Sequence, residues 1–296
     1  MVAPDIDVTV ELARALLAEQ HPDLADLPIR IAANGWDNTV LRLGADLALR
    51  LPRREAAAEL IRHEQRWLPV LAPALPAGVP VPVPVRRGAP SAAHGYPWAW
   101  SVLRWIDGTR VADVPVRERR HLAEPLAAFH RALHRPAPGE APRNPVRGVP
   151  LATRAEAFRA RLVRNHGGDA ARLRALFDAS AAAPMWDRAP VWLHGDPHPG
   201  NLLATRDGGL AVIDFGDLAA GDPATDLAVA WLAFDAHGRA TYRAALAEVH
   251  PTEDPVWHRA YGWALNVATA MLDSTDGDAW IRRMGERALH ELLTAD

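Results

Sequence analysis

The sequence of 296 residues predicts an α+β fold in two lobes: a small, mostly β N-terminal lobe with one main helix, and a larger α-rich C-terminal lobe. Residues 29–54 alternate apolar and polar side chains around two turn signals, Asn34-Gly35 and Gly44-Ala45-Asp46, which is typical of two or three antiparallel strands. Residues 55–72, and most of the chain after residue 112, have apolar residues at helical spacing. We expect lobes at 1–103 and 109–296, joined by a hinge at 104–108.

The remaining elements follow from the same patterns. The alternating prolines of residues 79–85 exclude a helix and a central strand, which leaves a polyproline II segment or an edge strand. Residues 5–20 predict a helix, 96–105 a strand, and 136–150 a Pro-rich surface loop. In the second lobe we expect a hairpin turn at Asp207-Gly208-Gly209 and helices at about 112–135 (kinked near Pro125), 152–165, 169–182, 224–236, 239–249, 255–273 and 277–293.

Composition excludes several classes of protein. The hydrophobic content of 49% argues against a disordered chain, and the absence of Cys excludes disulfides, thiolate metal sites and a Cys nucleophile. The formal net charge of −3 lacks the basic excess of a nucleic-acid-binding protein. We find neither an apolar run long enough to span a membrane nor a signal-peptide pattern, so we expect a cytoplasmic protein without nucleic-acid or membrane partners. The chain also lacks Lys, so chemistry that needs a Lys ammonium falls to Arg.

Two segments near residue 200 carry the side chains with chemical potential. The first reads His194-Gly195-Asp196-Pro197-His198-Pro199-Gly200-Asn201, and the second Val212-Ile213-Asp214-Phe215-Gly216. Pro and Gly between Asp196 and Asn201 place both on a loop, and the hairpin brings residues near 202 and 213 side by side. One carboxamide and two carboxylates therefore converge. A hard cation such as Mg²⁺ prefers such oxygen ligands, and a nearby carboxylate can accept a proton from a hydroxyl.

These segments resemble the catalytic loop and the metal-binding segment of the aminoglycoside phosphotransferase family, small-molecule kinases related to protein kinases. Residues 221–228, GDPATDLA, resemble the next segment of that family, and the resemblance covers about 29–296. It implies a bilobal protein-kinase-like fold, ATP (or GTP) and Mg²⁺ as cofactors, and a small hydroxylated acceptor. It also implies that Asp196 is the base that orients and deprotonates the acceptor hydroxyl, and that Asn201 and Asp214 hold Mg²⁺.

The resemblance implies a pair of charged residues in the first lobe that binds the nucleotide phosphates. Kinase-like folds pair a basic residue on the third strand with a Glu on the following helix, and Arg50 occupies that strand position. Its guanidinium can hold phosphate oxygens bidentately. We expect Glu64 to be its partner, with Glu59 as the competitor.

Two further segments match the nucleotide-binding pattern by resemblance alone. The phosphate-covering loop is reduced to a single Gly, so backbone N–H groups near Trp36 and Asn38 are expected to approach the phosphates. In the hinge, the resemblance implies that adenine binds the Arg104 C=O and the Ile106 N–H, with the side chain of Leu103 guarding the pocket behind.

Other residues have supporting or acceptor-binding interpretations. We expect His194 to brace the catalytic loop, His198 to have a structural role, and Asp226 to support the loop through backbone hydrogen bonds. The aminoglycoside-modifying members bind a polycationic sugar through carboxylates of the α-rich lobe. The candidates here are Asp217, Asp273, Asp276, Asp278, Glu286 and the aromatic residues Trp231, Trp263 and Trp280. The segment 273–278 could equally be a helix end followed by an N-cap.

The sequence therefore predicts an ATP- and Mg²⁺-dependent O-phosphotransferase that moves the γ-phosphate to a hydroxyl of a small molecule, most readily an aminoglycoside-type or other antibiotic. One alternative is a housekeeping kinase for a metabolite such as choline, homoserine or a sugar. The other is a non-catalytic kinase-like nucleotide-binding protein, against which the intact Asp196, Asn201 and Asp214 argue.

Overall fold

The computed structural model describes residues 3–165, 169–273 and 279–294. The chain divides into two compact units. The first comprises residues 1–73 and 81–107, and the second comprises 74–80 and 108–296. The sequence pattern did not indicate that 74–80 belongs with the second unit.

The first unit is built on a five-stranded antiparallel sheet in the order β1-β2-β3-β5-β4. The segment 29–54 forms three strands, at the upper end of the prediction, and the edge strand starts at Pro84, where a missing N–H is tolerated. In chain order the strands are β1 (Ile29–Asn34), β2 (Asn38–Leu43), β3 (Leu47–Pro52), β4 (Pro84–Gly88) and β5 (Trp100–Arg104).

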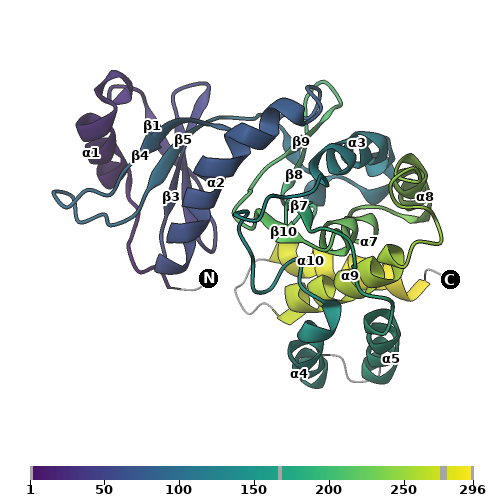
Figure 1. The fold of residues 1–296 in the computed structure, drawn as a ribbon. Coiled ribbons are helices and arrows are strands. Elements are labelled where there is room, and N and C mark those ends of the chain that lie inside the picture. The colour runs from purple at the N-terminus through teal and green to yellow at the C-terminus, as the bar shows by residue number, and fades with distance from the viewer. Residues whose placement is uncertain (1–2, 166–168, 274–278, 295–296) are drawn as a thin grey trace. The chain divides into compact units, whose positions relative to one another are not determined.

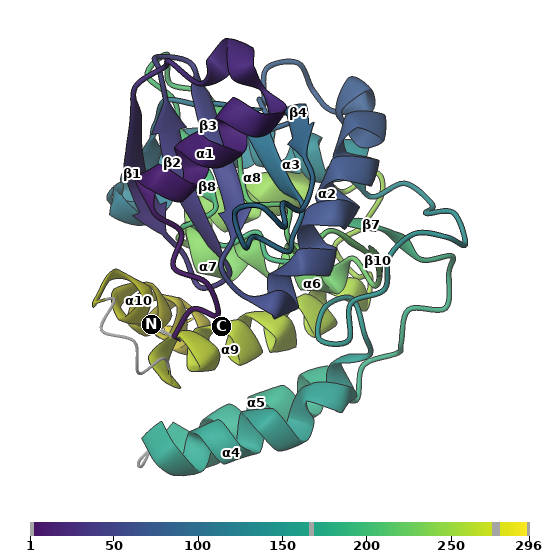
Figure 2. The same ribbon diagram turned by 90° about the vertical axis from the view of Figure 1, so that its left-hand side faces the viewer.

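Two helices, α1 (Val10–Gln20) and α2 (Ala58–Leu71), lie on opposite faces of this sheet (Figures 1 and 2). Helix α1 begins later than the sequence predicts, at the residue after Thr9, whose hydroxyl caps the helix by accepting the N–H of Leu12. Leu49 and Leu51 of β3 join α1 in one buried apolar cluster. Because side chains alternate along a strand, Arg50 between them points to the other face, where α2 packs.

The second unit is mostly helical and centres on α9, which contacts α4, α5, α6, α7 and α10. Trp263 and Leu265 of α9 are fully buried, as its apolar composition predicts. The helices are α3 (Ala123–Leu133), α4 (Ala155–Asn165), α5 (Ala170–Ala181), α6 (Ala224–Leu227), α7 (Val229–Ala233), α8 (Ala236–Ala245), α9 (Val256–Asp273) and α10 (Ala279–Thr294). Helices α4 and α5 run side by side along α9 (Figure 2).

Short strands frame the centre of this unit. Strand β7 (Val191–Leu193) pairs with β10 (Ala219–Gly221), and β8 (Leu202–Ala204) pairs with β6 (Thr109–Arg110) and β9 (Leu210–Val212). The β8–β9 hairpin turns at Asp207-Gly208-Gly209, as the sequence predicts, with Gly208 at φ +80°. The strands thus place the loop 194–201 and the segment 213–218 at adjacent ends of two small sheets.

In the second unit the structure differs from the predicted helices in three places, and one of them is the helix expected at 239–249, which is α8 at Ala236–Ala245. The helix expected at about 112–135 is a 3-10 segment followed by α3, with Pro125 in the first turn of α3, where its missing N–H costs no hydrogen bond. The helix expected at 224–236 is divided into α6 and α7. The 3-10 segments are Pro22–Leu24, Glu55–Ala57, Ala72–Ala74, Val111–Asp113, Val116–Leu122 and Leu151–Arg154. Within the described ranges, no helix is long and apolar enough to cross a membrane.

Candidate active site

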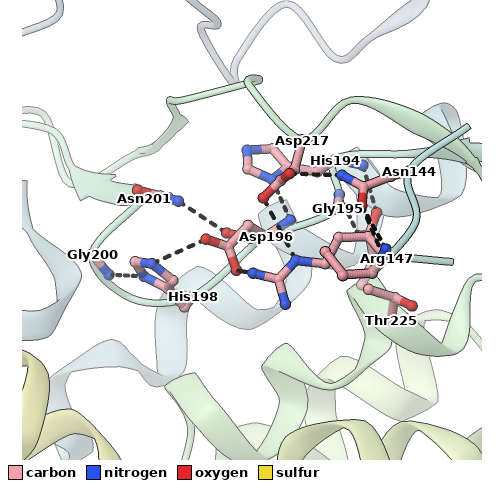
Figure 3. Close-up of polar contacts among 12 residues, drawn as sticks. Asn144, Arg147, His194, Gly195, Asp196, His198, Gly200, Asn201, Asp217 and Thr225 are labelled. Carbon is pink, nitrogen blue, oxygen red and sulfur yellow. Dashed lines mark hydrogen bonds and ion pairs between the residues drawn. The ribbon is translucent and has the colours of Figure 1, made fainter. Parts of the chain in front are cut away.

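The loop that carries Asp196 turns sharply at Gly195. This residue has φ +88°, and a Cβ there would lie 2.3 Å from the backbone oxygen of Asp217. Only glycine combines that backbone conformation with so close an approach. The loop therefore passes directly against the segment that follows Asp214 (Figure 3).

Asp226 of α6 holds the backbone of the same loop through hydrogen bonds. Its Oδ1 accepts the N–H of Gly195 at 2.8 Å, and its Oδ2 accepts the N–H of His194 at 2.8 Å and faces His134 Nε2 at 3.2 Å. Burial alone would raise the pKa of Asp226, but the hydrogen bond and charge of His134 lower it below its usual range. Asp226 is thus an ionised, fully buried support of the loop backbone.

The His194 ring connects the loop to the hairpin. Its Nδ1 accepts the N–H of Asp196 at 3.2 Å, so its Nε2 carries the hydrogen that the Ile213 carbonyl accepts at 3.0 Å. The ring also packs against Phe215, with ring centroids 4.7 Å apart. His194 therefore fixes the start of the loop relative to the residue just before Asp214.

The hairpin brings Asn201 and Asp214 together. Leu202 pairs with Val212, and the N–H of Ile213 donates to the Asn201 carbonyl at 2.9 Å. The side-chain nitrogen of Asn201 donates to the backbone oxygen of Asp196 at 3.0 Å, which leaves the amide oxygen as the atom able to bind a cation. Such oxygens suit a hard divalent cation, so the residues present fit Mg²⁺.

Asp214 has an unusual backbone. Its φ of +64° lies in the left-handed region. Among the non-Gly residues of the described ranges, Asp214 alone has a positive φ. Asp and Asn tolerate this region better than other side chains. Such strained positions cluster at functional sites, which agrees with the role that the sequence resemblance implies.

The guanidinium of Arg147, which the sequence patterns did not indicate, lies beside Asp196. Arg147 Nη2 donates to Asp196 Oδ1 at 2.8 Å, and Arg147 Nε lies 3.5 Å from Asp217 Oδ2 (Figure 3). His198 Nε2 lies 3.4 Å from the other oxygen of Asp196, and Asn144 donates to Asp217 at 2.7 Å. Arg147 belongs to the Pro-rich segment 136–150, whose composition predicts only a surface loop and gives no periodic signal.

One further cluster has the ligand types of a metal site. Nitrogen or oxygen atoms of His130, His134 and Asp226 lie within 4.8 Å of one another. The oxygens of Asp226 already accept hydrogen bonds from the loop and face His134, and His130 Nδ1 lies 2.7 Å from the hydroxyl of Tyr242. Burial holds the pKa of His130 well below its usual value. The hydrogen bonds of the cluster account for it as a support of the loop 194–201.

In the first unit, Arg50 and Glu64 form an ion pair with Nη1 and Oε2 3.3 Å apart. Arg50 is 5% exposed and Glu64 is fully buried. Glu59, the competing partner, is exposed and lies near Arg62 and His63 on the surface of α2. The structure thus pairs Arg50 with the Glu that the resemblance indicates.

The other nucleotide-binding candidates lie at the ends of strands in the same unit. The turn between β1 and β2 is closed by the N–H of Gly35 donating to the Asn38 carbonyl at 2.8 Å, and it leaves the Trp36 side chain 44% exposed. Leu103 is buried near the end of β5, where Arg104 is exposed and pairs with Leu47. Ile106 follows the strand and is half-buried.

The residues predicted to bind the acceptor lie in different parts of the second unit, and some already have partners. Asp217 lies beside Arg147, whereas Trp231 is buried against Trp257 and Tyr261. Asp273 forms an ion pair with Arg164 on α4. Trp263 is fully buried, Glu286 pairs with Arg282 on the surface of α10, and Asp276 and Asp278 lie outside the described residues.

Trp280 lies close to the loop 194–201. A Cβ built on Gly200 would lie 2.7 Å from the Trp280 ring, and the guanidinium of Arg110 lies over that ring, 4.5 Å from its centroid. Among the aromatic acceptor candidates, Trp280 therefore has the most direct contact with the loop that carries Asp196.

Comparisons with known proteins agree with this fold. The structure resembles the GDP complex of aminoglycoside 2'-phosphotransferase-IIIa (20% identity, TM-score 0.71, covering 95% of this chain and 97% of that one). It also resembles the streptomycin–ATP complex of APH(2")-IIa (14% identity, TM-score 0.59, covering 96% of this chain and 97% of that one). A further similar structure is the apoenzyme of macrolide 2'-phosphotransferase MphH from Brachybacterium faecium (22% identity, TM-score 0.58, covering 94% of this chain and 98% of that one). A search of curated proteins finds no match.

The α+β kinase-like fold and the loop–hairpin site define the class as a small-molecule kinase that transfers a phosphoryl group to a hydroxyl. The chain belongs to the phosphotransferase enzyme family, whose model matches residues 28–263. The family resemblance and the fold class predicted from the sequence are thereby confirmed.

Proposed function

We propose that this protein is an ATP- or GTP-dependent, Mg²⁺-requiring O-phosphotransferase acting on an aminoglycoside-type or other antibiotic, and that it works in the cytoplasm. The observation that carries the chemistry is the convergence of Asp196, Asn201 and Asp214 through the Asn201–Asp196 and Ile213–Asn201 hydrogen bonds. Similar solved structures hold GDP, ATP and aminoglycosides, which supports the nucleotide and the class of acceptor.

Each residue has a role that follows from its chemistry. Asp196 accepts the hydrogen of the acceptor hydroxyl and aims its oxygen at the γ-phosphorus. Asn201 and Asp214 would hold Mg²⁺, which when bound neutralises charge on the phosphate oxygens. In the first unit, Arg50 grips phosphate oxygens while Glu64 keeps its guanidinium in place. Backbone groups of Trp36, Asn38, Arg104 and Ile106, with the Leu103 side chain, complete the proposed nucleotide site.

A second candidate is a metabolite kinase with a less cationic acceptor, such as an amino alcohol or a sugar. Two carboxylates expected to bind a polycationic sugar already face guanidinium groups: Asp217 faces Arg147, and Asp273 faces Arg164. An acceptor with several ammonium groups would have to compete with those guanidiniums.

The test is steady-state consumption of ATP or GTP with Mg²⁺, across aminoglycosides, macrolides, peptide antibiotics, sugars and amino alcohols. We expect one class to stimulate turnover, and Asp196→Ala to lower that turnover by roughly 10²–10⁴-fold while nucleotide still binds. Stimulation by amino alcohols or sugars alone would select the metabolite kinase. Full acceptor-stimulated turnover in Asp196→Ala would show that another group is the base.

A further inference from the structure

Arg147 joins the two acidic segments of the site. Its guanidinium donates to Asp196 at 2.8 Å and lies 3.5 Å from Asp217, and the side chain is only 21% exposed. Burial lowers the pKa of Arg147, but the charges of Asp196 and Asp217 raise it on balance, so the guanidinium stays charged. A single cation thus lies between two carboxylates that would otherwise repel each other.

The backbone around Arg147 is held on its N-terminal side. The carbonyl of Pro142 accepts the N–H of Ala220 in β10 at 2.8 Å. The side chain of Asn144 accepts the N–H of Arg147 at 3.1 Å through Oδ1 and donates to Asp217 at 2.7 Å through Nδ2. Asn144 therefore ties the backbone of Arg147 to one of the carboxylates that its guanidinium faces.

The backbone on the C-terminal side of Arg147 is also held by hydrogen bonds. The N–H of Gly148 donates to the Thr225 hydroxyl at 2.9 Å, and its carbonyl accepts the N–H of Asp222 at 3.0 Å. Gly148 has φ +65°, and a Cβ there would lie 2.5 Å from Leu193. Contacts on both sides fix the loop against β7, β10 and α6, so the position of Arg147 is determined by the fold.

We propose that Arg147 is a positioning residue for phosphoryl transfer, which holds the Asp196 carboxylate in the orientation that receives the acceptor hydroxyl, with Asp217 and Asn144 holding Arg147. The inference rests on the proposed function of Asp196. A carboxylate has about four lone-pair sites. Arg147 occupies one on Oδ1 and His198 faces Oδ2, which restrains rotation of the side chain and leaves sites for the hydroxyl.

The kinetic test compares Arg147→Met and Arg147→Lys with wild type on the acceptor that stimulates turnover. We expect Arg147→Met to lower kcat about 100-fold, the usual scale for a misplaced reacting group, with the KM for nucleotide nearly unchanged. Arg147→Lys should recover part of kcat because the charge remains while the fork geometry is lost. Wild-type kcat in Arg147→Met, or a loss confined to KM for nucleotide, would overturn the positioning role.

The matched control is Arg143→Met, an exposed Arg on the same loop, which should keep wild-type kcat. Asp217→Asn supplies a second route if Arg147→Met folds poorly. It removes the charge that holds Arg147 and should lower kcat in the same direction without changing the KM for nucleotide. Unchanged kcat in Asp217→Asn would contradict its holding role.

A stability measurement separates this inference from the proposed function. Urea midpoints are measured for wild type, Arg147→Met, Asp196→Asn and the double variant. We expect the double variant to shift the midpoint by less than the sum of the single shifts, because both single changes remove the same contact. Additive shifts would overturn the Arg147–Asp196 pairing. If wild type shows no acceptor-stimulated turnover, the proposed function fails while this cycle still decides the pairing.

Discussion

The Asp226 carboxylate accepts the backbone N–H of Gly195 at 2.8 Å, which ties helix α6 to the turn that presents Asp196. The neighbouring N–H of His194 donates to the same carboxylate. The orientation of the loop 194–201 therefore depends on a buried charge 31 residues away in sequence and on a glycine that can adopt φ +88°.

We predict that Gly195→Ala destabilises the protein by about 2–3 kcal/mol, since it adds strain at positive φ and a clash with Asp217. The clash would also push apart the loop and the Asp214 segment, so turnover should fall. Urea denaturation checks the stability. The control is Gly139→Ala, where a Cβ would meet nothing within 4 Å. Equal effects of the two substitutions would refute this account of Gly195.

We predict that Arg50→Lys weakens nucleotide binding only in part, because the charge remains while the bidentate grip is lost. Glu64→Ala should instead destabilise the first unit by about 3–5 kcal/mol, since it breaks an ion pair in which Glu64 is fully buried. Calorimetric titration with Mg·ATP and urea denaturation separate the two effects. The exposed Glu59→Ala serves as the control and should change neither. Unaltered affinity in Arg50→Lys would mean that Arg50 does not touch phosphate.

We predict that Asp214→Asn abolishes Mg²⁺-dependent nucleotide binding while the protein stays folded. Asn tolerates the left-handed backbone of Asp214, so this substitution removes the charge and leaves the conformation possible. Calorimetry with and without Mg²⁺ provides the measurement, and the thermal midpoint shows whether the fold is kept. Wild-type Mg·ATP affinity in a folded Asp214→Asn would count against the metal role.

We predict that stability falls as the pH is lowered from about 6.5 to 4. Burial lowers the pKa of His250 to about 4, and that of His130 is also well below its ordinary value near 6.5. In this window the unfolded chain binds protons that the folded protein does not, so each group reduces stability by up to about 1.4 kcal/mol per pH unit. Above pH 6.5 both states hold these groups neutral, and their contribution is constant.

Urea denaturation between pH 4.5 and 7.5 measures this dependence. His250→Gln should flatten the acid side of the profile, whereas the exposed His237→Gln should leave it unchanged. An identical slope in wild type and His250→Gln would show that His250 is not the group responsible.

The parts of the site that the sequence predicted depend on short-range geometry. Asp196 and Asn201 share one loop, and the hairpin turn at Asp207-Gly208-Gly209 carries the chain back to Asp214. Arg50 and Glu64 are also close in sequence, because a strand leads directly into the helix that covers it. Alternation in strands and spacing in helices are visible in residue types, so the strand and the helix could be predicted from the sequence. That Arg50 pairs with a Glu of that helix was expected from the family resemblance, with Glu59 as the competitor of Glu64.

By itself, the sequence determined the α+β class through periodic patterns, and it predicted through a loop and a hairpin turn that Asp196, Asn201 and Asp214 converge. The family resemblance left Glu64 and Glu59 as possible partners of Arg50, and the structure decided for Glu64. Only the tertiary structure decided that Arg147 reaches Asp196 across 49 residues and that His134 reaches Asp226 across 92. It also showed that Asp217 lies beside Arg147. Polar contacts between distant segments leave no periodic trace in the sequence, because they exist only where packing brings two loops to the same place.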